Sequence, residues 1–122
     1  MRSLFALLLV VHGIAHLVGF VVPFGLMAVP DLAARTTIFG GALDVGDAGA
    51  KAVGIVWLAL ALGFCASGAA VLAGWWDAVW VVRLAAISLV FCLVGWPDAR
   101  IGLFVNLAII VALFAIRQLS AA

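Results

Sequence analysis

Residues 3–29 read SLFALLLVVHGIAHLVGFVVPFGLMAV and contain no charged side chain. A helix needs about 20 mostly apolar residues to cross the hydrocarbon core of a bilayer. This stretch is long enough, and it also exceeds the usual apolar region of a secretory signal peptide. We therefore expect a membrane-crossing helix that stays in the mature chain. Pro23 predicts that the helix kinks or stops near residue 22, which leaves residues 23–30 as an interfacial extension.

Three further apolar blocks follow, at residues 48–73, 78–95 and 99–116, with short polar segments between them. Of the 122 residues 70% are apolar and 9% charged, and the mean hydropathy is +1.46. Soluble domains have an apolar share of about half. The sequence thus predicts one domain, an all-α integral membrane protein with four transmembrane helices in an antiparallel up-down bundle. Its first partner is the lipid bilayer.

The connections between the blocks carry helix-boundary signals. Asp47, Asp77 and Asp98 each stand at or just before an expected helix start, where a carboxylate can cap free backbone N–H groups. Residues 95–98, GWPD, predict a tight turn, because proline cannot donate to a helix backbone. The only long loop, residues 30–47, could cover one end of the bundle. Small residues recur at intervals of four in block 48–73, which favours a tightly packed central helix or a self-association face.

The charges exclude several classes of partner. The net charge is +1 and like charges do not cluster, so neither nucleic-acid binding nor a polybasic lipid patch has support. Cys65 and Cys92 lack the spacing of a redox motif. Arg83 lies six residues beyond Asp77, and its long side chain can reach back to the interface; a contact with an anionic group is the alternative. No carboxylate lies within an apolar block, which disfavours an ion-coupled transporter.

His12 and His16 are the ionisable residues deepest in the first block. Residues four apart share a helix face, so both rings point to one side, at a depth near the middle of the membrane. On an antiparallel last helix Asn106 comes to a similar depth, and Cys92 lies near that level. We predict a polar cluster of His12, His16, Asn106 and Cys92, with a hydrogen bond between His16 and Asn106 as its preferred contact.

This cluster allows four interpretations. The histidines can be neutral structural rings that hold helices together. They can bind zinc, for which Cys92 is the only plausible third ligand. One of them can ligate haem, but only with a second ligand from another helix or subunit, because two rings on one face cannot reach opposite sides of one iron. The cluster can also form the polar end of a pocket for a lipid-like molecule, with or without acid-base chemistry.

The leading prediction is a small structural or hydrophobic-ligand-binding membrane subunit without enzymatic activity. It would work as a homo-oligomer or with a larger membrane partner. The alternative is a membrane-embedded enzyme, or a metal- or haem-binding protein, that acts on a lipid-soluble substrate. An oligomeric channel or transporter component comes third.

Two stretches, HGIAHLVGF at 12–20 and WPDARIGLFVNL at 96–107, resemble a group of small four-helix membrane proteins of bacteria, especially actinobacteria. The layout is also similar to that of DoxX-like proteins. The resemblance implies a bacterial plasma-membrane location and brings no established activity. It also implies a set of signature positions in this chain: His12, Gly13, His16, Gly19, Trp96, Pro97 and Asn106.

Overall fold

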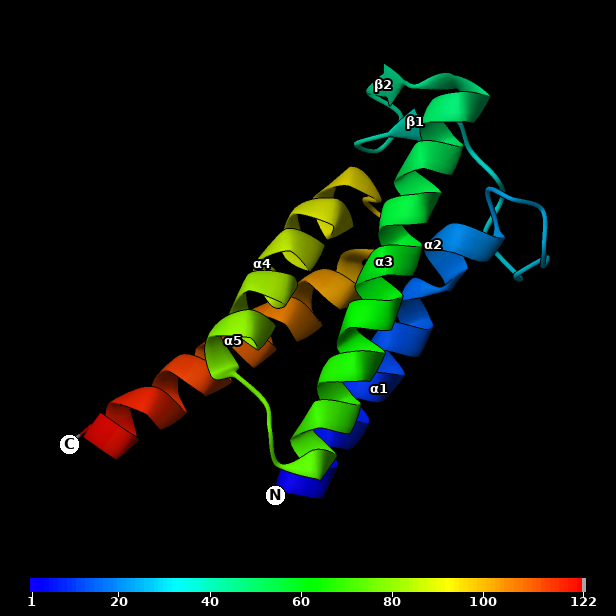
Figure 1. The fold of residues 1–122 in the computed structure, drawn as a ribbon. Coiled ribbons are helices and arrows are strands. Elements are labelled where there is room, and N and C mark those ends of the chain that lie inside the picture. The colour runs from blue at the N-terminus through cyan, green and yellow to red at the C-terminus, as the bar shows by residue number, and fades with distance from the viewer. Residues whose placement is uncertain (122) are drawn as a thin grey trace.

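The computed structural model describes residues 1–121, and the side chains of residues 1–118. The chain is mainly helical, as predicted, with one small hairpin (Figure 1). The elements are α1 (Arg2–His16), α2 (Val18–Val21), β1 (Thr37–Ile38), β2 (Leu43–Asp44), α3 (Gly46–Ala73), α4 (Ala78–Val94) and α5 (Arg100–Ala121). Three stretches are long and apolar enough to cross a membrane: Arg2–Val21, Gly46–Ala73 and Arg100–Gln118. The apolar helix α4 is shorter, with 17 residues.

The long helices pack as two pairs, α1 with α3 and α4 with α5, and α3 also contacts α2 and α4 (Figure 1). Glycines let α1 and α3 approach closely. A Cβ atom on Gly13 would lie 2.8 Å from the carbonyl oxygen of Ala61, and one on Gly68 would lie 2.9 Å from that of Ala6. These pairs show that α1 and α3 run in opposite directions. Because α3 contacts α1, α2 and α4, the prediction of a central helix is confirmed for α3.

The first helix ends earlier than its apolar block. After α2 the chain turns at Val22–Gly25, where the backbone N–H of Leu26 donates to the carbonyl of Val21 and Gly25 has a φ of 65°. The stop near residue 22 is confirmed, but a helix that continues to residue 29 is wrong. At the other end of the chain α5 runs to Ala121, beyond the predicted end at residue 116.

The long loop is anchored to the end of the molecule where α4 meets α5. Its hairpin pairs Thr37 with Asp44 and Ile38 with Leu43. The backbone N–H of Phe39 donates to the carbonyl of Val94, at 2.9 Å. The loop therefore lies over one end of the helices, as the sequence suggested, although the hairpin itself was not predicted.

The predicted cap at Asp47 is wrong. The N-cap residue is Val45, and Asp44 just before it binds the helix start: its Oδ1 accepts from the N–H of Gly46 at 2.9 Å, which holds the pKa of the Asp44 carboxyl below its ordinary value. Asp47 lies in the first turn of α3 and forms an ion pair with Lys51 at 3.0 Å. α3 begins at Gly46, two residues earlier than the sequence pattern suggested, so the earlier aspartate is at the helix end.

The cap at Asp77 is confirmed, because its Oδ1 accepts from the N–H of Val79 at 2.8 Å. We expect Asp77→Ala to lower the free energy of unfolding by about 1 kcal/mol. Thermal unfolding in detergent measures the change. Asp77→Asn keeps the accepting oxygen without the charge and should stay near the wild type. Equal losses in both variants would assign the effect to the charge instead of the cap.

Candidate functional site

A cavity of about 530 Å³ lies between α1–α2 on one side and the α4–α5 corner on the other. Its walls are mostly apolar, and the loop segment from Leu32 to Ile38 covers one end. The volume is within the range of about 300–1,000 Å³ that small-molecule sites have. The cavity exists because α1 packs on α3 and α5 on α4, while α1 and α5 make little contact with each other.

The cavity opens sideways between α1 and α5. Apolar residues on both rims line it and are exposed on the outside of the molecule: Leu8 by 43%, Val11 by 55% and Ile101 by 73%. Ala15 on α1 also lines the cavity and is exposed. An apolar molecule can thus reach the cavity from the apolar surface of the helices.

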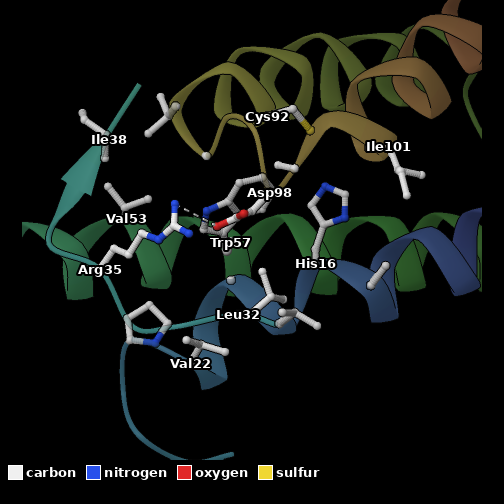
Figure 2. A pocket seen from close by; sticks show the side chains of 18 of the residues that line it. His16, Val22, Leu32, Arg35, Ile38, Val53, Trp57, Cys92, Asp98 and Ile101 are labelled. Atoms are coloured by element: carbon white, nitrogen blue, oxygen red, sulfur yellow. Dashed lines mark ion pairs between the residues drawn. The ribbon is translucent and has the colours of Figure 1, made fainter. Parts of the chain in front are cut away.

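An ion pair stands at the loop-covered end. Arg35 Nη1 lies 3.7 Å from Asp98 Oδ2, and Figure 2 shows the two side chains meeting beside Trp57. Asp98 was predicted to cap the last helix; it instead pairs with the loop, and α5 starts at Arg100. Both side chains are more than a third exposed, so the pair adds little to stability.

The opposite, deep end of the cavity holds the polar cluster. His12 Nε2 lies 3.0 Å from Asn106 Oδ1, and Asn106 Nδ2 donates to Ser88 Oγ at 2.8 Å and to Cys92 Sγ at 3.5 Å. His16 Nε2 lies 2.6 Å from Ser88 Oγ, and His16 Nδ1 lies 2.7 Å from the carbonyl oxygen of His12. All five residues are buried. The cluster therefore connects α1 to both α4 and α5.

The proton positions in this cluster follow from its acceptors. The His12 carbonyl only accepts, so His16 Nδ1 carries the proton. A buried ring with no carboxylate among its hydrogen-bond partners stays neutral, so His16 Nε2 accepts from the Ser88 hydroxyl. Ser88 Oγ then accepts from Asn106 Nδ2, which turns Asn106 Oδ1 toward His12. Hence His12 Nε2 is protonated and donates to Asn106.

The structure brings together His12, His16, Asn106 and Cys92, but the predicted pair is wrong. Asn106 bonds to His12, and His16 bonds to Ser88. Helical rise predicts depth only to within a few ångströms, and the two rings on the same face of α1 differ in depth by only about one turn, or about 5 Å. Ser88 was missed. It is the only hydroxyl residue in block 78–95 and lies one turn before Cys92, which was the available signal.

The second ring nitrogen of His12 faces the cavity. Every fully buried side-chain nitrogen or oxygen in the described part of the chain has a hydrogen-bond partner. His12 Nδ1 has none there, so it is not sealed off, although His12 is only 5% exposed. His12 lines the cavity, which is the accessible space next to its ring. With Nε2 protonated, Nδ1 presents a lone pair to the cavity.

Aromatic rings of α3 support the two histidines from behind. The ring centroid of Phe64 lies 4.7 Å from that of His12 and 5.3 Å from that of His16. Trp57 lies 5.1 Å from His16 and also lines the cavity. A Cβ on Gly19 would come within 2.5 Å of the Trp57 ring, so this glycine makes room for the indole. The imidazoles are thus held in place by packing as well as by hydrogen bonds.

The hydrogen bonds leave little for a metal ion. Both ring nitrogens of His16 are engaged, so the histidines do not present two free imidazoles on one face. Among the described residues no group of three or more His, Cys, Asp and Glu side chains could hold a metal. Arg83 is exposed on α4, away from the residues that line the cavity.

Comparison of the chain with protein-family models, with curated proteins and with solved structures finds no match. The likeness to small actinobacterial four-helix proteins and to DoxX-like proteins therefore stays a prediction.

Proposed function

We propose that this chain is a multi-pass protein of a bacterial plasma membrane that binds a lipid-soluble small molecule in the cavity between α1 and α5. The observation that carries the proposal is a mostly apolar cavity with a sideways opening and a buried polar cluster at its deep end. Ligand sites of soluble and membrane proteins share this design, in which apolar walls supply affinity and a few polar groups fix orientation.

The outer faces of the helices support the membrane part of this proposal. Large apolar side chains are exposed on all four longer helices, among them Leu7, Ile14, Ile55, Leu62, Ile87, Val90, Phe104 and Val111. Soluble monomers rarely expose such continuous apolar surface, whereas lipid tails match it. In the bilayer α1–α2, α3, α4 and α5 would cross in alternating directions. The exposed Arg83 would then extend its side chain toward the interface.

The binding role predicts that a bulky side chain at the opening blocks the cavity. We expect Ala15→Phe to abolish the binding of 4-hexylphenol, a small amphiphile, to protein in phosphatidylcholine nanodiscs. Binding is measured by the dependence of the melting temperature on the ligand's mole fraction in the bilayer. Ala66→Phe is the matched control, because Ala66 is exposed on α3 and does not line the cavity. Binding that survives Ala15→Phe would contradict the proposed site.

A second measurement identifies what the protein carries. Native mass spectrometry of gently purified protein should show a retained small molecule that Ala15→Phe loses. An absorption spectrum and elemental analysis of the same sample test the haem and zinc alternatives, since haem would give a Soret band and zinc near-stoichiometric metal. Either of these signals would replace lipid binding as the function of the histidine pair.

A further inference from the structure

We infer that the cavity selects molecules whose polar head donates a hydrogen bond, a hydroxyl or phenol, and that the acceptor is Nδ1 of His12. This inference rests on the proposed function and specifies the ligand class of that site. It starts from an observation that the protein's own folding does not use: a ring that is 95% buried keeps one nitrogen without a partner and open to the cavity.

The positions of the protons in the cluster determine whether His12 Nδ1 donates or accepts a hydrogen bond. The obligatory acceptor is the His12 carbonyl, and from it the order runs through His16, Ser88 and Asn106 back to the His12 ring. Each step has one assignment once the first is fixed. The last step puts the proton of His12 on Nε2, so Nδ1 can accept and cannot donate.

Apart from the Cys92 thiol, a weak donor, no other polar group at the deep end is free to bind the ligand head. His16 uses both nitrogens, and the Asn106 amide is engaged on both its oxygen and its nitrogen. The stronger donors that line the cavity are the indole N–H of Trp57 and the side chains of Arg35 and Thr37, and the last two come from the loop at the far end. A ketone, quinone or ether head placed against His12 Nδ1 would face a lone pair with no hydrogen to share, whereas a hydroxyl would donate to it.

The test compares two ligands with the same apolar body, 4-hexylphenol and 4-hexylanisole. The phenol donates a hydrogen bond, and the methyl ether only accepts. In phosphatidylcholine nanodiscs we expect the phenol to bind the wild type about 3- to 10-fold more tightly, on a bilayer mole-fraction scale, as one net hydrogen bond predicts. Both dissociation constants come from the ligand dependence of the melting temperature.

Variants then locate the acceptor. In His12→Gln the side-chain amide N–H can still donate to Asn106 Oδ1, and this bond places the amide oxygen away from the former position of Nδ1. We expect the preference for the phenol to disappear there, with anisole affinity unchanged. Thr37→Val removes the hydroxyl at the far end and should keep the preference.

Each outcome decides between the inference and its premise. Equal binding of both ligands to the wild type would overturn the inference and leave the proposed function standing. A preference that persists in His12→Gln would do the same, because another group would then hold the head. Binding of neither ligand would overturn the proposed function itself. The comparison within the wild type needs no variant, so a folding defect in His12→Gln cannot hide the answer.

Discussion

Gly13→Leu is expected to separate α1 from α3 and to lower the free energy of unfolding by about 3 kcal/mol or more, as overpacking of a tight interface does. The reason is the identity of the nearest atoms. A Cβ at this position would stand 2.8 Å from the Ala61 carbonyl oxygen, 2.8 Å from Cys65 Sγ and 3.0 Å from Phe64 Cβ. The first of these is backbone within a helix, which cannot turn away as a flexible side chain can.

In Gly13→Ala two effects on the free energy of unfolding oppose each other. Alanine favours a helix over glycine by about 1 kcal/mol, which would stabilise the variant. The close contact with the Ala61 carbonyl destabilises the variant, and we expect this cost to exceed the gain in helix propensity. Melting temperatures in detergent should therefore fall in the order wild type, Gly13→Ala, Gly13→Leu. Ala69→Leu, on the exposed face of α3, is the control and should melt like the wild type. A Gly13→Ala variant that melts higher than the wild type would show that the interface can relax.

The sequence predicted the helices well because their signal is a length of apolar residues, which needs no knowledge of neighbours. It also identified four of the five cluster residues, since polar side chains in apolar blocks stand out. It could not predict which of them pair. His16 and His12 lie only one turn apart on α1, so a shift in depth of about 5 Å decides which ring Asn106 meets.

The cavity could not be predicted from the sequence, for a different reason. It depends on how little α1 and α5 touch each other, and a pattern of apolar residues predicts contacts better than gaps. The loop posed a similar problem, because Asp44 and Asp47 are equally good capping residues. The turn at Gly40 and Gly41 brings the chain back so that Asp44 reaches the helix end first. Such outcomes depend on the path of the whole loop.

Asn106→Leu is expected to lower the free energy of unfolding by about 2–3 kcal/mol, because it leaves two buried groups without partners, each costing about 1–3 kcal/mol, partly offset by relaxation. The variant has a similar volume, so the loss is one of hydrogen bonding. The orphaned groups are the N–H of His12 Nε2 and the accepting lone pair of Ser88 Oγ. Interhelical hydrogen bonds in membranes average less than this, since groups that lose a partner there often find another. Here the cluster residues are buried and the other polar atoms are already engaged.

A double variant separates this explanation from lost packing. His12→Leu removes the stranded donor, so His12→Leu/Asn106→Leu should be no less stable than Asn106→Leu alone, and the two losses should be far from additive. Additive losses in the melting temperatures and unfolding free energies would mean that each side chain acts through its own packing. In that case Asn106 would not fix the orientation of the His12 ring, and the lone pair that His12 offers to the cavity would have to be held by another contact.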